Sequence, residues 1–238
     1  RRPPRSTLDR SSAAADVYKR QEVTIPKNQV CCGAINTHVG DLETARQLAR
    51  RNIDTFLNSS AQSIVVASAG CGVRMKEYGH LLLQDPDYAE KANKFSSMVK
   101  DIHEFLADLP LTPPKGKLDY TVTYQDSCHL SNAQAITAQP RTLIQSIPWA
   151  KFVELKNSAI CCVAGGTYTI TERESSQNIL NAKMKEINNT SADIIASANP
   201  GCVLQLQLGS KTSAVPIEVR YVTDLLDESY RLEDGAQP

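Results

Sequence analysis

The sequence predicts an α/β protein of two related domains, with mainly parallel sheets flanked by helices. Short continuous apolar runs alternate with longer segments of helical periodicity, which is the pattern of buried parallel strands and their covering helices. The same order of cysteine pair, helix and apolar run occurs twice, about 130 residues apart. A chain of 238 residues is long enough for two small cores, so one domain per repeat is expected.

The first repeat is expected to form a domain at residues 22–110. Residues 41–58 place apolar side chains at helical spacing and begin with Asp41, which predicts a helix with an aspartate N-cap. Residues 63–68 are a short apolar run and predict a buried strand. Residues 87–109 predict one long helix.

The second repeat is expected to form a domain at residues 118–238, after a proline-rich linker at 111–117. Its main helix is predicted at 172–188, with Thr171 as the N-cap and with one buried face made by Ile179, Leu180, Met184 and Ile187. The other predicted elements are strands at 120–124, 151–155, 193–197 and 216–221 and a closing helix at 223–230.

Residues 1–21 carry an excess of basic side chains and have no apolar periodicity. We expect them to be a non-native or disordered leader. Cys128 leads the second repeat, and no cysteine takes the same place before Cys31. We therefore expect the first domain to be truncated at its N-terminus.

Composition excludes several classes of protein. The 26 basic and 26 acidic residues balance, which gives no support to nucleic-acid binding. No apolar run reaches the roughly 18 residues that a transmembrane helix needs. Seven cysteines in a chain of this size argue against a secreted disulfide scaffold. A cytoplasmic protein with reduced thiols is expected.

All seven cysteines fall into the repeated layout, as Cys31, Cys32 and Cys71 in the first repeat and Cys128, Cys161, Cys162 and Cys202 in the second. The lone cysteines follow predicted strands and the pairs precede predicted helices. Because ligands bind at the carboxyl ends of parallel strands, these thiols are expected to converge there. Thiolates bind soft metals, so we predict that all seven are metal ligands and that they hold an iron–sulfur cluster.

Each cysteine pair is expected to lie in an irregular loop. Two adjacent cysteines cannot point the same way from an extended strand. Glycine allows the loop to turn so that the two thiols reach different atoms of one cluster, and Gly33, Gly165 and Gly166 lie close to the pairs.

Structural zinc, inert buried thiols and thiol–disulfide exchange are the alternatives for the cysteines. Zinc sites and redox dithiols commonly use C-x-x-C pairs, and the sequence contains none. Among neighbouring residues, His129 fits a structural histidine, a hydrogen-bond partner of the cluster or a further ligand. His80 and His103 are expected at the surface. Lys76, Glu77 and Tyr78 fit either a partner surface or an exposed helix start.

Short stretches around the cysteines form recognisable motifs, namely Cys31-Cys32-Gly33-Ala34, Ala69-Gly70-Cys71-Gly72, Lys76-Glu77-Tyr78-Gly79, Cys128-His129-Leu130, Cys161-Cys162 with Gly166-Thr167-Tyr168, and Ala198-Asn199-Pro200-Gly201-Cys202. Together they resemble the CCG cysteine-rich domain family, from residue 22 to the end of the chain. This family includes the B subunit of heterodisulfide reductase and, as a closer resemblance, the iron–sulfur subunit of glycolate oxidase.

The resemblance implies an iron–sulfur electron-transfer subunit of a flavin-dependent 2-hydroxy-acid (glycolate) dehydrogenase or oxidase. Such a subunit is an electron carrier and not the substrate-oxidising subunit. It takes electrons from a partner flavoprotein that holds the FAD, and passes them toward a quinone or another membrane acceptor. The resemblance further implies a 4Fe–4S cluster and a cytoplasmic location, peripheral at the inner face of the membrane.

The chain departs from the family pattern at three positions. Heterodisulfide-reductase-type domains end in C-x-x-C, but the first position of that motif is Ser68 in one repeat and Asn199 in the other. Four cysteines in the second repeat therefore favour a cubane-like cluster. A disulfide-reducing subunit and a structural zinc module are the alternative functions. Val163 replaces the glycine of the second CCG motif, where a β-branched residue is strained if the backbone φ is positive.

Overall fold

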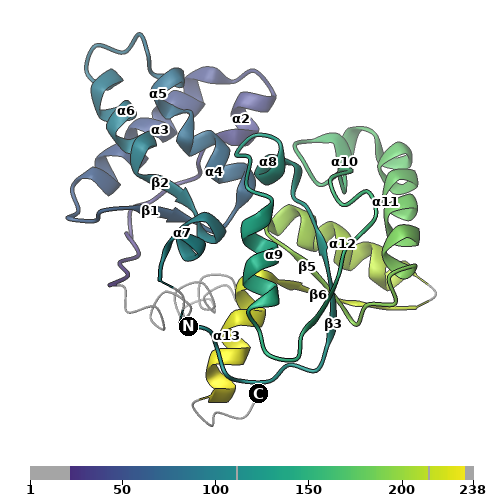
Figure 1. The fold of residues 1–238 in the computed structure, drawn as a ribbon. Coiled ribbons are helices and arrows are strands. Elements are labelled where there is room, and N and C mark those ends of the chain that lie inside the picture. Colours follow the sequence, from purple (N-terminus) through teal and green to yellow (C-terminus); the bar gives the residue numbers. More distant parts are fainter. Residues whose placement is uncertain (1–21, 111, 214, 234–238) are drawn as a thin grey trace, which may run out of the picture. The chain divides into compact units, whose positions relative to one another are not determined.

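The computed structural model describes residues 22–110, 112–213 and 215–233, so the predicted leader at 1–21 lies outside the described residues. The chain divides into two compact units, Thr24–Ile102 and the residues from His103 onward (Figure 1). Each unit has its own parallel sheet and its own helices, which confirms the predicted α/β class. The domain boundaries at residues 110 and 118 stay a prediction.

The first unit contains a two-stranded parallel sheet, β1 (Ile64–Val66) and β2 (Val99–Asp101). Its helices are α2 (Ala34–His38), α3 (Leu42–Leu57), α4 (Ala69–Lys76), α5 (Tyr78–Leu81) and α6 (Ala89–Met98). As predicted, the Asp41 carboxylate caps α3, accepting a hydrogen bond from the Thr44 N–H at 3.2 Å. The core of the unit packs α3 and α6 against the sheet, with Ile53 and Phe95 fully buried.

The prediction of one long helix at residues 87–109 is wrong. The segment is divided into α6, strand β2 and helix α7 (Ile102–Asp108). Val99, Lys100 and Asp101 pair with β1, opposite Ile64, Val65 and Val66. Helical periodicity continues through this stretch, but pairing with a strand 35 residues earlier and burial of the β-branched Val99 outweigh it.

The second unit contains a four-stranded, fully parallel sheet in the order β4-β3-β5-β6. The strands are β3 (Thr121–Gln125), β4 (Lys151–Val153), β5 (Ile194–Ser197) and β6 (Glu218–Tyr221). The two central strands align at their carboxyl ends, with Gln125 opposite Ser197. This register brings the segments that follow β3 and β5 to one edge of the sheet.

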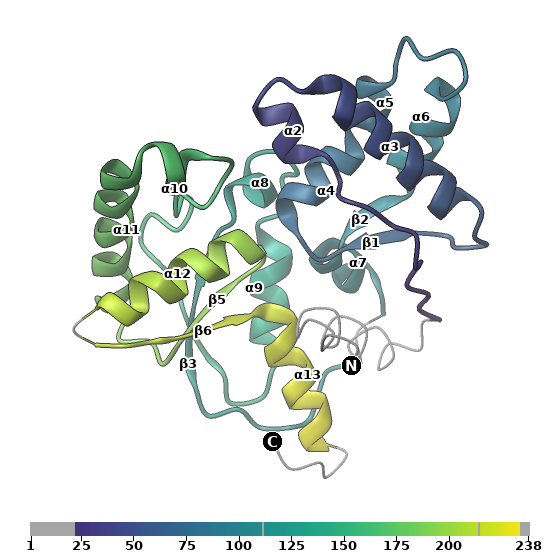
Figure 2. The ribbon, with the colours of Figure 1, turned by 180° about the vertical axis from the view of Figure 1, so that it is seen from behind.

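Helices cover both faces of this sheet. They are α8 (Cys128–Ser131), α9 (Ala138–Gln145), α10 (Tyr168–Thr171), α11 (Arg173–Asn188), α12 (Pro200–Thr212) and α13 (Val222–Glu233). Figures 1 and 2 show α9 and α12 on opposite faces. The core between α11, α12 and the sheet includes Leu180, Ile195 and Leu206, none of which is exposed.

Two details predicted for the main helix of this unit are wrong. Thr171 ends α10, and its hydroxyl donates to the Thr167 carbonyl at 3.4 Å, so it does not cap α11. Ile179 is 37% exposed, whereas Leu180, Met184 and Ile187 are buried. The face of α11 that packs into the core is therefore narrower than the face predicted from the sequence. Helix α12 was not predicted, although Pro200 at its start is a common first helical residue.

Part of the predicted linker is anchored on the second unit. The Ser229 hydroxyl of α13 donates to the Gly116 carbonyl at 2.5 Å. A Cβ at position 116 would overlap the Ser229 carbonyl oxygen, so the close approach requires glycine.

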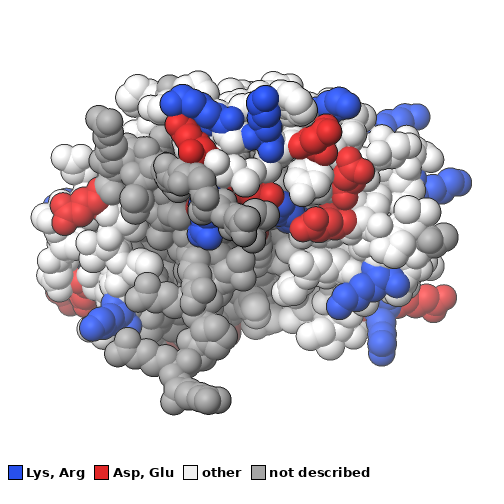
Figure 3. Space-filling model, turned by 90° about the horizontal axis from the view of Figure 1, so that it is seen from below, with Lys and Arg blue, Asp and Glu red and all other residues white. Residues whose placement is uncertain are grey.

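The face drawn in Figure 3 carries both basic and acidic side chains. Among the described residues, none of the helices combines the length and the apolar character needed to cross a bilayer.

Candidate metal centre

The lone cysteines of the second unit lie directly after neighbouring parallel strands. Cys128 begins α8, three residues after the end of β3, and Cys202 lies in the first turn of α12, five residues after the end of β5. Because β3 and β5 pair in parallel register, both cysteines reach the same edge of the sheet. Ser127 and Ser197 approach each other there, with their hydroxyl oxygens 3.4 Å apart.

All four thiols of the second unit are in contact in one series. The Sγ atoms of Cys128 and Cys161 are 3.9 Å apart. Side-chain hydrogen bonding with Cys161 and Cys202, together with burial, raises the pKa of Cys162, which links the remaining two thiols to the series. Cys161 is exposed whereas Cys162 is buried, so the two side chains of the pair point in different directions. Residues up to 74 positions apart are thereby assembled into one thiol cluster.

Hydrogen bonds stabilise negative charge on some of these sulfurs. Hydrogen bonds from the Cys128 and Cys162 thiols lower the pKa of Cys161, and the Val163 N–H adds a donor at 3.2 Å. Side-chain hydrogen bonding between Cys162 and Cys202 lowers the pKa of Cys202 to about 7 against the opposing effect of burial. The Asn199 side-chain amide contributes to this by donating to Cys202 Sγ at 3.6 Å. These contacts favour the thiolate, which is the metal-binding form of cysteine, at Cys161 and Cys202, whereas they raise the pKa of Cys128 and Cys162.

The turn after each cysteine pair has a left-handed backbone. Gly33 has φ 78° and Val163 has φ 64°. The strain expected for a β-branched residue at this position is therefore present, and Val163 holds the same turn that glycine forms in the first unit. In that unit a Cβ at position 33 would lie 3.2 Å from Ala45 Cα, so the packing there favours glycine.

The first unit brings its three cysteines together in a similar way. A hydrogen bond from the Cys32 thiol lowers the pKa of Cys71 to about 6, and Cys31 interacts electrostatically with Cys32. Cys71 lies in α4, after β1. Ser68 also hydrogen-bonds to Cys71, as Asn199 does to Cys202. The two residues that stand at the missing C-x-x-C positions thus contact the following cysteine sulfur as hydrogen-bond partners.

Tyr78 positions the first cysteine pair and is not a surface residue. It is fully buried, and its hydroxyl donates to the Cys32 carbonyl at 2.9 Å. The Asn52 amide donates to the Cys31 carbonyl at 3.2 Å and to the Tyr78 hydroxyl at 3.1 Å. From the sequence, Tyr78 was expected on a partner surface or at an exposed helix start, and Asn52 was not predicted to be part of the site. His103, also expected at the surface, is 2% exposed.

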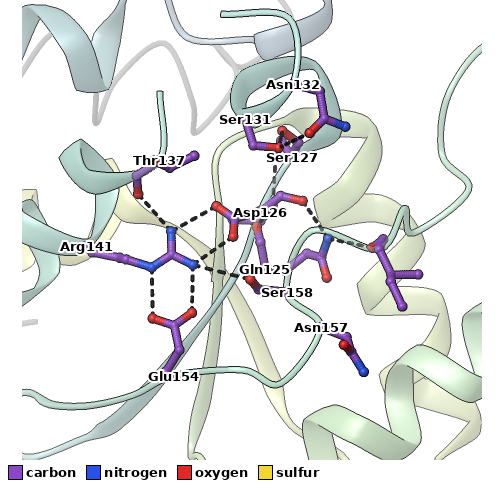
Figure 4. Close-up of polar contacts among 12 residues, drawn as sticks. Gln125, Asp126, Ser127, Ser131, Asn132, Thr137, Arg141, Glu154, Asn157 and Ser158 are labelled. Carbon is purple, nitrogen blue, oxygen red and sulfur yellow. Dashed lines mark hydrogen bonds and ion pairs between the residues drawn. The ribbon is translucent and has the colours of Figure 1, made fainter. Parts of the chain in front are cut away.

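Arg141 joins the segments that precede Cys128 and Cys161, by contacting Asp126 in one and Ser158 in the other (Figure 4). Its two terminal nitrogens donate to the two carboxylate oxygens of Asp126 at 2.9 and 2.7 Å. The same guanidinium donates to Glu154 at 2.9 and 2.6 Å and to the Ser158 hydroxyl at 3.3 Å. Asp126 lies two residues before Cys128, and Ser158 lies three residues before Cys161.

This ion-pair network was not predicted, because its members are far apart in the sequence. The carboxylates of Glu154 and Asp126 raise the pKa of Arg141, so the guanidinium stays charged. The Gln125 amide makes a further link by donating to the Ile160 carbonyl at 3.3 Å. Asp126 therefore pairs with Arg141 just before the segment that begins with Cys128.

The four thiols of the second unit lie in series, with N–H donors near Cys161 and Cys202. Across residues 22–110, 112–213 and 215–233, no three Cys, His, Asp or Glu side chains are arranged to hold one metal ion. The chemistry of four thiols suits an iron–sulfur cluster. Iron–sulfur clusters take four cysteine thiolates, and such N–H donors tune them.

The CCG cysteine-rich domain family matches residues 7–76 and 122–207, which together make up more than half of the chain. The chain belongs to the CCG cysteine-rich domain family. This confirms the resemblance drawn from the motifs. The two matches in this CCG protein correspond to the two repeats, and they include all seven cysteines.

Curated relatives of this CCG protein carry names from 2-hydroxy-acid metabolism. It is 38% identical over 212 residues to the probable glycolate oxidase iron–sulfur subunit of Bacillus subtilis, over 87% of this chain and 48% of that protein. It is 29% identical to lactate utilization protein A of Bacillus licheniformis, over 87% of this chain and 86% of that protein. It is 27% identical to the glycolate oxidase iron–sulfur subunit of Escherichia coli, over 97% of this chain and 56% of that protein. The chain thus spans about half the length of the first of these relatives.

Proposed function

We propose that this CCG protein binds an iron–sulfur cluster in its second unit and carries electrons in a 2-hydroxy-acid-oxidising complex. The observation that carries the proposal is the contact series of the four thiols at one sheet edge. Cys128, Cys161, Cys162 and Cys202 are the ligands we assign, and a 4Fe–4S cluster is the type that four cysteines suit.

The relatives support the class of complex. Two of them are named as glycolate oxidase iron–sulfur subunits and another as a lactate utilization protein. By analogy, the partner is a flavoprotein that holds the FAD and oxidises the 2-hydroxy acid. The acceptor is a quinone or another membrane component, and the protein works at the cytoplasmic face of the membrane.

The residues of the site have separate tasks in this proposal. The bound cluster supplies one-electron redox chemistry. Buried Cys162 and Cys202 fix the site to the core, whereas exposed Cys161 lies at the surface, where a partner can approach. Ile160 and Ile170, near Cys161 in the sequence, are 54% and 80% exposed. Apolar side chains at an exposed redox site suit contact with a partner protein.

The first unit has a smaller donor set. It consists of three cysteines, Cys31, Cys32 and Cys71, which is one thiol fewer than the second unit contains. We therefore expect this set to bind little iron by itself, although its thiols remain candidate ligands.

A disulfide-reducing function is less well supported. Family members of that type carry a fifth cysteine at the C-x-x-C position. Here Asn199 and Ser68 occupy that position and hydrogen-bond to Cys202 and Cys71.

Iron and acid-labile sulfide analysis of the anaerobically reconstituted protein, with its visible spectrum, tests the proposal. We expect about four iron per chain with broad brown absorbance. Cys128→Ser and Cys202→Ser should each abolish this, whereas Cys31→Ser should change the iron content little. Colourless protein with about one zinc per chain would overturn the proposal in favour of a structural metal module.

A further inference from the structure

Strand β6 forms an edge of the second-unit sheet. It lies at the end of the strand order β4-β3-β5-β6 and, among the strands that the structure describes, pairs only with β5. In a parallel pair, alternate residues direct their N–H and C=O groups toward the neighbouring strand, so the other residues of β6 direct theirs away from β5. An edge of this kind is a template for pairing with a further strand.

The side chains of β6 alternate between the core and two opposite charges. Val219 packs into the core, and Glu218 and Arg220 lie on the other face of the strand. The Glu218 side chain is 60% exposed, and its carboxylate lies 3.8 Å from Arg220 Nε. Arg220 also pairs with Glu228 of α13 at 2.5 Å. A guanidinium has five N–H donors, so Arg220 can bind a further carboxylate beside Glu228.

A second copy of β6 complements these charges when it pairs antiparallel with the first. In a symmetric dimer with its two-fold axis at Val219, this residue lies opposite its own copy. Glu218 of each chain then lies directly opposite Arg220 of the other chain, where opposite charges stabilise a sheet. A register shifted by one residue places Glu218 opposite Tyr221 and loses both charge pairs. The charges therefore select one register.

Helix α12 presents exposed leucines beside this edge. A groove between α12 and β6 is lined by Gln207, Ser210, Lys211, Ile217, Glu218 and Val219. Leu204, Leu208 and Lys211 have the i, i+4, i+7 spacing of one helix face, so the leucines extend the α12 side of the groove. Leu204 is 67% exposed and Leu208 is 47% exposed. Figure 2 shows α12 beside β6.

The same symmetry brings the leucines of two copies to one side of the joined sheet. An axis at Val219 keeps the faces of the two sheets aligned, because residues of like parity face each other across the axis. Both α12 helices then cover the same face, on either side of the β6 pair. Exposed apolar side chains next to an open strand edge are typical of a contact surface.

We propose that the β6 edge is a dimerisation surface, at which two copies of this chain join their sheets antiparallel with Glu218 of one copy opposite Arg220 of the other. The leucines of α12 flank this contact. The surface contains none of the cysteines, so dimerisation does not depend on the proposed function above.

Sedimentation velocity of the purified full chain over a concentration series tests the proposal, with a reducing agent present to exclude disulfide-linked dimers. Wild type should show a monomer–dimer equilibrium. Glu218→Lys creates two like-charged pairs across the axis and should weaken dimerisation about tenfold or more. Leu204→Glu should weaken it similarly. Leu83→Glu is the matched control, because Leu83 is a 61% exposed leucine of the first unit, and it should dimerise like wild type.

Mixing two variants tests the register. The partner for Glu218→Lys is Arg220→Glu/Glu228→Gln, in which the second change removes the carboxylate that Arg220 balances. Each variant alone has like charges across the axis and should be largely monomeric. The mixture restores both opposite-charge pairs and should form a heterodimer. Circular dichroism of each variant checks that it is folded.

Three results would overturn the inference. The first is a wild type that stays monomeric at the highest concentration reached. The second is a dimer that Glu218→Lys and Leu204→Glu leave as tight as wild type, which would locate the contact elsewhere. The third is a folded pair of variants that fails to associate on mixing.

Discussion

Arg141→Met is expected to destabilise the second unit by about 3–5 kcal/mol. The side chains of Asp126 and Arg141 are only 6% and 19% exposed, so the pair is largely buried. Removing one partner of a buried pair leaves the other charge uncompensated, at a cost of about 3–5 kcal/mol. The Glu154 side chain is 53% exposed, so its pairing with the same guanidinium adds at most about 1 kcal/mol.

Urea unfolding of the metal-free protein, followed by far-ultraviolet circular dichroism, measures this loss. Glu154→Gln is the control, because it removes only the exposed half of the network. The double variant Arg141→Met/Asp126→Asn should recover part of the stability, because it removes the unpaired charge. The reasoning would be refuted if Arg141→Met cost no more than Glu154→Gln.

Cluster assembly should respond to the same substitution. The network joins the loops of Cys128 and Cys161, so Arg141→Met should lower the iron content after reconstitution well below that of Glu154→Gln. Equal iron in both variants would mean that the loops are held in place without the arginine.

Three further predictions concern packing and pH. Tyr78→Phe leaves polar groups of the first cysteine loop without a partner and should cost about 1–3 kcal/mol in urea unfolding; no measurable loss would contradict its positioning role. Gly116→Ala should cost about 1–3 kcal/mol because the added methyl group overlaps the Ser229 carbonyl, whereas Gly165→Ala, with no neighbour closer than 3.9 Å, should be tolerated. Burial raises the pKa of Asp227 despite its ion pair with Arg231. The folded state therefore holds this proton more tightly than the unfolded state, and wild type loses stability as the pH rises above about 4. Asp227→Asn should gain stability relative to wild type over that rise, and parallel pH profiles would contradict this.

The fold class and the position of the cysteines follow from local features of the sequence. The helix cap at Asp41 depends only on the residues next to it in the sequence. The parallel strands were predictable because buried strands appear in the sequence as short apolar runs. The backbone strain at Val163 was predictable because a glycine stands at the same place in the other repeat. Assembly of the four thiols followed from parallel topology, which places strand ends at one edge. Metal binding by these thiols stays a prediction.

Tertiary structure decided the remaining features, because they depend on partners far along the chain. Strand β2 replaces a stretch of predicted helix because β1 is available to pair with it. Arg141 reaches a carboxylate 15 residues earlier and another 13 residues later, and Lys183 reaches carbonyls 25 and 26 residues earlier. Such contacts cannot be predicted from the periodicity of apolar residues or from the spacing of motifs. The sequence by itself thus determined the fold class, the family and the candidate ligands, whereas only the folded chain determined which charges surround them.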